Sequence, residues 1–218
     1  MNYELLVDKL MQHFTSGPYA ADVATAKKEF FDRAGTFDEQ SNDFEMKMAQ
    51  FADWYLFHRP LDAANLPPLV YALQGSDYEV SEETKPFYEN LKNSIHSIFE
   101  YQKLKNEDVY IKDLFSGKKY VLKKSVVSIG FNKDELFEAR LIPHEDNYIF
   151  GRSFCFHPDA ANRFIAKEIK KIKKGPPEQL EAEKEKLIIR LFKMRYKHEQ
   201  YKHVGLKDIY SNESKLRL

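Results

Sequence analysis

Residues 98–157 are the long region of the chain in which apolar and polar positions alternate with a period of two. Such alternation is typical of strands that bury one face. Ser116-Gly117 separates two of the alternating runs, and this pair fits a tight hairpin in which Gly117 supplies the positive φ angle. The pattern predicts about five short strands with hairpin connections, in a small antiparallel β-sheet or barrel.

Before this region, apolar residues recur at the spacings of three and four that are typical of helices. The two clearest stripes are Leu6, Leu10 and Phe14, and then Phe44, Met48, Phe51 and Tyr55. Further helices are expected over about 20–33, 67–73 and 83–97. Gly35 falls where a C-terminal glycine cap is expected. Residues 1–97 are therefore predicted to be a helical region.

After the β region, residues 158–218 return to helical spacing. A Lys-rich helix is expected to end at Gly175-Pro176-Pro177, and a long helix should follow over about 177–203. The apolar positions of the long helix are spaced by sevens, fours and threes, which suits packing along a partner helix. These positions are Leu180, Leu187, Leu191, Met194, His198 and Tyr201. The two helices either form a hairpin on this chain, or the second extends to another chain.

The predicted fold class is therefore α+β. An N-terminal helical region (1–97) precedes a small antiparallel β unit (98–157), and basic C-terminal helices (158–218) follow as a helical hairpin. A hydrophobic content of 43% with 31% charged residues is ordinary globular composition and argues against wholesale disorder.

Charge is unevenly distributed, although the formal net charge is zero. Residues 161–218 hold 16 Lys and Arg against 8 Asp and Glu, and residues 1–160 hold 18 against 26. The C-terminal part thus carries a net charge of +8 and the remainder −8. This asymmetry indicates either docking within the chain or a basic tail with an anionic partner.

Cys155 is the sole cysteine, so no internal disulfide is possible and nothing points to an oxidising compartment. The first residues lack the basic start and apolar run of a signal peptide. No window approaches the ~18 apolar residues that a membrane span requires. We expect a soluble cytoplasmic protein without a membrane partner.

Three segments together resemble a group of uncharacterised bacterial proteins, some of which carry a C-terminal SEC-C zinc-binding motif. The segments are Phe51-Ala52-Asp53-Trp54-Tyr55-Leu56-Phe57-His58-Arg59-Pro60-Leu61, Asp113-Leu114-Phe115-Ser116-Gly117-Lys118-Lys119-Tyr120 and Ala139-Arg140-Leu141-Ile142-Pro143. The resemblance covers about residues 35–157. It implies helices followed by a small β unit, a bacterial origin, and no known activity. The SEC-C motif needs cysteines near the C-terminus, and none follows Cys155, so a zinc role is not carried over.

Cys155 and His157 share a face of the expected last strand, and His144 lies across the preceding turn, so these three residues are weak candidates for metal ligands. A zinc site needs three or four converging ligands, so no metal and no cofactor are predicted and these residues are candidates only. His198 and His203 lie five residues apart, about 140° round a helix, which excludes the zinc-protease motif.

Nucleophile and phosphate-loop motifs are absent from the sequence: it contains no Gly-x-Ser-x-Gly, Gly-x-x-x-x-Gly-Lys or Gly-x-Gly-x-x-Gly. Cys155 could pair with His144 or His157, but a cysteine between Phe154 and Phe156 on a strand is typical of a packed, inert thiol. No catalytic residue is predicted. An enzyme of unrecognised type centred on Cys155 and His157 is the third hypothesis.

Nucleic-acid binding is the second hypothesis, because the C-terminal helices are rich in basic residues interleaved with Tyr196 and Tyr201. The candidate contacts are Lys170, Lys173, Lys174, Arg190, Lys193, Arg195 and Lys197. Glutamates interrupt the basic run and the isoelectric point is about 7.1, which weakens this interpretation.

The leading hypothesis is a non-catalytic cytoplasmic binding or adaptor module that engages a protein partner, or a second copy of itself, through its C-terminal helices. The spacing of the apolar positions and the opposite charges of the two parts support it. The expected contact residues are Leu187, Leu191, Met194 and Tyr201.

Overall fold

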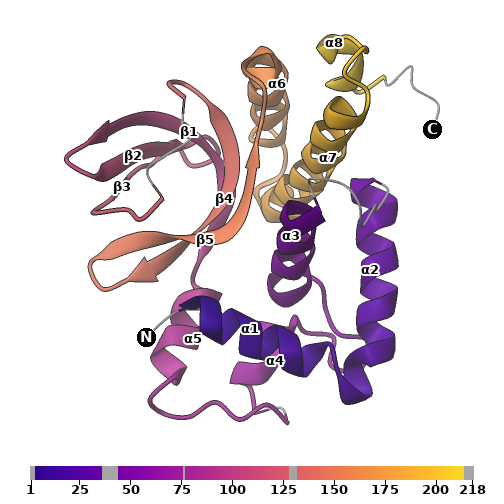
Figure 1. Cartoon of the computed structure of the whole chain (residues 1–218), viewed down its shortest axis with the longest axis vertical. Helices are drawn as coiled ribbons and strands as arrows, with labels where there is room; N and C mark the ends of the chain where they lie inside the picture. Colours follow the sequence, from indigo (N-terminus) through magenta and orange to yellow (C-terminus); the bar gives the residue numbers. More distant parts are fainter. Residues whose placement is uncertain (1–2, 36–43, 76, 128–131, 214–218) are drawn as a thin grey trace. The chain divides into compact units, whose positions relative to one another are not determined.

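The computed structural model describes residues 3–35, 44–75, 77–127 and 132–213. In these residues the chain forms helices α1 to α8, three short 3-10 helices and strands β1 to β5 (Figure 1). The predicted α+β class is confirmed.

The described residues divide into two compact units. Unit 1 holds those of 1–32, 36–95 and 140–153, and unit 2 holds those of 33–35, 96–139 and 154–218. Strands β4 (Leu136–His144) and β5 (Asn147–Phe156) therefore contribute residues to both units.

Unit 1 is mainly helical. Its helices are α1 (Tyr3–Phe14), most of α2 (Ala20–Ala34), α3 (Phe44–Phe57), α4 (Pro68–Leu73) and α5 (Lys85–Lys92). The apolar stripe predicted for the first helix is buried, since Leu6, Leu10 and Phe14 are at most 2% exposed. The Tyr55 hydroxyl, on α3, donates a 2.6 Å hydrogen bond to the carbonyl of Phe14 and joins the two helices.

The core of unit 1 is aromatic between α2 and α3. The Phe30 ring lies 5.8 Å from Phe51 and 5.4 Å from Trp54, in edge and tilted arrangements that aromatic pairs favour. Phe51 and Tyr55 are fully buried, as their predicted helix face requires. The last turns of α3 are buried on several sides, which explains why they are apolar almost all round.

The β-sheet has the strand order β3-β2-β1-β4-β5, with β1 spanning Ile95–Lys105, β2 Asp108–Asp113 and β3 Lys119–Leu122. Strands β1, β2 and β3 pair antiparallel in sequence order, with Tyr101 opposite Ile111 and Ile111 opposite Tyr120. The sheet in the described residues is open, so of the two predicted arrangements the chain forms a sheet and not a barrel.

Two turns fix the register of these strands in unit 2. Asn106 and Glu107 join β1 to β2 with positive φ angles of 51° and 67°, the combination that a two-residue hairpin favours. Gly117 has the predicted positive φ, at 75°. The buried Asp113 carboxylate accepts hydrogen bonds from the Ser97 hydroxyl at 2.6 Å and from the Phe115 backbone at 3.0 Å, which ties the β2–β3 turn to β1.

The C-terminal part of unit 2 contains α6 (Asn162–Ile172), α7 (Leu180–Gln200) and the short α8 (Leu206–Ile209). Helices α6 and α7 lie side by side as a hairpin (Figure 1). The chain reverses at Gly175-Pro176-Pro177, where a break was predicted. The long helix therefore packs on its own chain.

Candidate functional site

A groove lies between α6 and α7, within unit 2, and we call it the hairpin groove. Its volume is about 480 Å³. Ile172 and Leu187 give it an apolar lining, and Gly175 and Pro176 of the reversing turn lie beside them. Charged side chains complete the lining: Glu168, Lys171, Glu183, Lys186 and Arg190. The groove thus combines a small apolar surface with a charged rim.

Glu168 is the most buried charged residue of this groove, at 5% exposed. Its carboxylate oxygens lie 2.9 Å from Lys171 Nζ and 2.7 Å from Arg190 Nη2. Burial alone would raise the pKa of Glu168, but hydrogen bonds from Lys171, Asn212 and Arg190 outweigh it and hold the pKa below its usual value. Glu168 is therefore a carboxylate that organises the cations around it.

Arg190 reaches both Glu168 and the C-terminal segment. Its Nη1 donates a 2.9 Å hydrogen bond to the side-chain oxygen of Asn212. Its Nε atom is buried and has no hydrogen-bond partner among the described residues. Arg190 thus joins α7 to α6 and to the C-terminal segment, with its Nε atom enclosed by the protein.

Lysines dominate the solvent side of α6. Lys167, Lys170 and Lys171 are exposed on the helix, and the exposed Lys173 and Lys174 follow directly after its end. Lys173 Nζ also lies 3.4 Å from the carbonyl of Leu114. Glu168 offsets part of this charge through its ion pair with Lys171. The surface beside the hairpin groove is consequently basic.

The residues predicted to bind a partner are mostly inside the chain. Leu187, Leu191 and Met194 are 2%, 1% and 6% exposed. Tyr201 follows the end of α7 and is half-buried. Leu187 is the member of this set that lines the hairpin groove. The chain's own side chains therefore largely cover these four residues. That they contact a partner stays a prediction.

The residues predicted to bind nucleic acid separate into three kinds. Lys170, Lys173 and Lys174 are exposed. Arg190 and Arg195 are held by Glu168 and Glu199. Lys193 and Lys197 are half-buried. Burial lowers the pKa of Lys197, and the nearby positive charge of Lys193 lowers it further. Lys170, Lys173 and Lys174 are thus the part of this set that is open to a polyanion.

Cys155 and His157 lie together in the interior of unit 2, both at most 2% exposed. His157 Nδ1 is 3.2 Å from the Tyr210 hydroxyl, and its Nε2 is buried without a hydrogen-bond partner in the described residues. Burial, assisted by the charge of Arg195, lowers the pKa of His157 to about 3, so the imidazole is neutral at pH 7. His157 is therefore an uncharged residue of the protein interior.

The role of Cys155 and His157 as metal ligands or catalytic groups stays untested. Among the described residues no third His, Cys, Asp or Glu ligand joins either of them in a group that could hold an ion. His144 belongs to unit 1, where its ring meets that of Tyr3 edge-on at 5.6 Å. Packing accounts for what is observed of all three residues.

Unit 1 contains a buried ion pair that the sequence did not reveal. Arg140, 4% exposed, donates to Asp53 Oδ1 at 2.7 Å and to Oδ2 at 2.6 Å. It also donates to His58 Nε2 at 2.8 Å and to the Ser94 hydroxyl at 2.9 Å, and its guanidinium lies 3.9 Å from the centre of the Phe57 ring.

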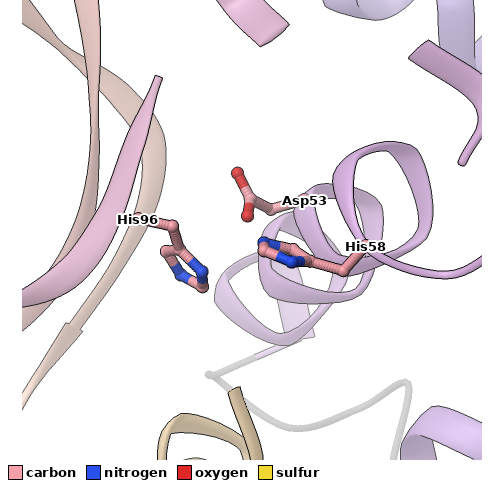
Figure 2. Close-up of side chains that lie close together, drawn as sticks. All are labelled: Asp53, His58 and His96. Atoms are coloured by element: carbon pink, nitrogen blue, oxygen red, sulfur yellow. The ribbon is translucent and has the colours of Figure 1, made fainter. Parts of the chain in front are cut away.

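Asp53 and His58 extend from the C-terminal end of α3, as Figure 2 shows. They would be a natural pair of metal ligands, but Arg140 already occupies both carboxylate oxygens and the imidazole Nε2. A guanidinium always carries positive charge, so it opposes a cation at these atoms. The Arg140 cluster is therefore suited to holding unit 1 together.

The sequence contained one signal for the centre of the hairpin groove. Glu168 follows Ile165 by three residues and precedes Ile172 by four, so it falls on the apolar side of its helix. A carboxylate on such a face requires a paired cation or hydrogen bonds. Arg190, on the other helix of the hairpin, provides the cation.

In the part of the chain that the structure describes, no helix has the length and apolarity needed to cross a membrane. No curated protein and no solved structure matches the chain. The resemblance to SEC-C-associated proteins stays a prediction. A family of unknown function, DUF7986, matches residues 4–202, which is most of the 218 residues. The chain therefore belongs to the DUF7986 family.

Proposed function

We propose that the chain is a non-catalytic binding protein of the cytoplasm, and that its hairpin groove takes a short acidic segment of a protein partner. The observation that carries the proposal is the composition of the groove. Ile172 and Leu187 offer an apolar surface for one side chain, and the cations around Glu168 surround it. A segment with an apolar residue between acidic residues matches both features.

Charge favours an acidic occupant over a basic one. The rim holds three cations against two carboxylates: Lys171 and Arg190 pair with Glu168, and Lys186 lies 2.7 Å from Glu183. The side chains of Lys171, Arg190 and Lys186 remain 56%, 40% and 65% exposed, so the rim keeps a net positive charge that is open to solvent. The neighbouring lysines of α6 add to their field, and a field of one sign speeds the encounter with a partner of the opposite sign.

Site-specific photo-cross-linking in living cells tests the proposal. A benzophenone amino acid replaces Gln179, an exposed residue that lines the groove. The matched control replaces Gln200, which is exposed at the far end of α7. We expect adducts from position 179 to a protein whose cross-linked peptide carries acidic residues around an apolar one. Equal adduct yields from both positions, or no protein adduct from 179, would exclude this use of the groove.

Charge reversal then tests the electrostatic part. The Lys171→Glu, Lys186→Glu double variant should lose the adduct from position 179. The Lys202→Glu, Lys207→Glu variant changes the net charge equally at two exposed lysines that do not line the groove, so it should keep the adduct. Adducts that persist in the first variant would show that rim charge does not attract the partner.

A second candidate function is binding of RNA or DNA, which the exposed lysines in and just after α6 support. A complex that forms through Lys170, Lys173 and Lys174 should weaken steeply with salt, since each phosphate contact releases counterions. An electrophoretic shift with mixed RNA and with duplex DNA at low salt measures this, and the Lys170→Ala, Lys173→Ala, Lys174→Ala variant should abolish it. No shift at low salt would eliminate this candidate.

A further inference from the structure

A second groove lies in unit 1, between α1 and the segment from Asp77 to Tyr88, and we call it the α1 groove. Its volume is about 700 Å³, within the ~300–1,000 Å³ range of small-molecule sites. It is independent of the hairpin groove, which lies in unit 2.

One face of α1 forms the first wall. Leu6, Lys9 and His13 line it, at helical spacings of three and four, and Ser16 follows just after the end of the helix. The opposite wall comes from the segment before and within α5, with Tyr78, Ser81, Thr84 and Tyr88 lining it.

Asp77 anchors the second wall to the first. The Tyr19 hydroxyl donates a 2.6 Å hydrogen bond to Asp77 Oδ1, and His13 Nε2 lies 3.2 Å from the same oxygen. The hydrogen bond from Tyr19 lowers the pKa of Asp77 more than any other interaction does. The Asp77 carboxylate is therefore ionised at neutral pH, and the groove is held in shape before a ligand arrives.

Aromatic rings line part of the α1 groove. The centre of the His13 ring is 5.1 Å from that of Tyr78, and the Tyr78 and Tyr88 hydroxyls lie 2.6 Å apart. Such rings offer an apolar face together with a polar group at their edge. A ligand with flat apolar patches and surrounding hydroxyls can use both.

The side chains that line the groove provide donors and acceptors, with one cation and one anion among them. Lys9 and Glu79 carry opposite charges, and in the described part of the chain neither forms an ion pair. Gln12 adds an amide that both donates and accepts, and Ser16, Ser81 and Thr84 add hydroxyls. This set suits sugar hydroxyls, which also donate and accept, better than a phosphate or a polyamine of one sign.

We propose that the α1 groove binds a short neutral oligosaccharide. Its carbon-hydrogen faces pack against the His13 and Tyr78 rings, and its hydroxyls bond to Gln12, Glu79 and Lys9. This site goes beyond the proposed function, because it takes a small ligand in the other unit. Its outcome does not depend on what occupies the hairpin groove.

An array of neutral, acidic and amino oligosaccharides, probed with the labelled full-length protein, tests the proposal. We expect binding to a set of neutral glycans. Titration of the ¹⁵N-labelled protein with the best of them should shift the amides of Lys9, Gln12, His13 and residues 78–84. No binding to any neutral glycan, or binding to charged glycans alone, overturns the proposal. The zwitterionic dipeptide Lys-Glu is titrated in the same way. If the dipeptide shifts these amides and no glycan shifts them, the proposal is overturned.

Two pairs of variants locate the contacts. Glu79→Gln and Gln12→Ala, both at exposed positions, should each weaken glycan binding at least tenfold without changing the melting temperature. Glu82→Gln and Gln74→Ala are matched changes at exposed positions that do not line the groove, and they should leave the affinity within twofold. Equal affinities across all four variants would place the glycan elsewhere and refute the assignment.

Discussion

Arg140 and Asp53 form a two-point ion pair, although 87 residues separate them in the sequence. Both hydrogen bonds are short, and the Arg140 side chain is 4% exposed. Breaking a buried pair leaves one charge without compensation, at a cost of about 3–5 kcal/mol. We predict a loss of this order in the free energy of unfolding of the Arg140→Gln variant, measured by urea denaturation.

Arg152→Gln is the control for this prediction. Arg152 pairs with Asp8 at 2.7 Å, but the two side chains are 41% and 60% exposed. Solvent screens such a pair, so its loss should cost less than about 1 kcal/mol. Similar losses in the two variants would show that burial does not decide the strength of the Arg140 pair.

Because of His157, the free energy of unfolding should fall in mild acid. The unfolded chain takes up a proton at this residue near its ordinary pKa of 6.5, and the folded chain only near 3. Between these values the unfolded state binds more protons, so the contribution of His157 is complete above pH 6.5 and declines as the pH falls. Between pH 7 and pH 5, this one residue should lower the free energy of unfolding by about 2 kcal/mol.

Urea denaturation at pH 7 and pH 5 measures this effect, with His157→Phe as the comparison. The variant keeps a buried ring and removes the titrating group, so its stability should change less between the two pH values. If both proteins lose the same stability, His157 does not titrate differently in the folded and unfolded chains.

Gly117 should be sensitive to substitution for backbone reasons alone. Its φ is +75°, and nothing lies within 4 Å of an added Cβ atom. Gly117→Ala should therefore cost about 1–2 kcal/mol through the left-handed conformation. Gly117→Asn should cost less, because asparagine tolerates this region. Thermal or urea denaturation ranks the variants, and equal costs for Ala and Asn would point to a steric origin.

Cys155 should be inert in the folded protein. Its side chain is fully buried, so a thiol reagent such as DTNB should label it only after denaturation. Cys155→Ser should destabilise the protein by about 1–3 kcal/mol, because a hydroxyl in this interior needs a hydrogen-bond partner. Cys155→Ala, which introduces no polar group, is the control. Rapid labelling of the native protein would contradict the buried position.

Local spacing was enough to predict much of the fold. The stripe from Leu6 to Phe14 places one face of α1 in the core, and the predicted break at Gly175-Pro176-Pro177 separates α6 from α7. Gly35 and Gly117 both have the predicted positive φ angles, of 109° and 75°. These features depend on neighbours within a few residues, which is the range that spacing and turn chemistry describe.

The boundary between α5 and β1 was predicted wrongly. A helix over 83–97 was expected, but α5 ends at Lys92 and β1 begins at Ile95. Ser97, Ile98 and Phe99 are all fully buried, so the strand has no exposed face here and shows no alternation. A strand buried on both faces cannot be told from a buried helix by periodicity alone.

The aromatic face of β5 is not its more buried face. Phe154 and Phe156 are half-buried, whereas Cys155 and Ser153 on the other face are fully covered. Hydrophobicity favoured the aromatic face, yet the smaller side chains fit the tighter interior. Contacts between distant residues, such as Arg140 with Asp53 or Arg190 with Glu168, leave no periodic signal at all.

The division of β4 and β5 between the units has a consequence for synthesis on the ribosome. The helices of unit 1 up to Lys92 emerge early, but Asp53 meets its partner only after Arg140 has been translated. A nascent chain that stops before residue 140 carries an uncompensated carboxylate in what will become a protein interior. Unit 1 should therefore fold late, in one step with the hairpin that completes it, and be a substrate for chaperones until then.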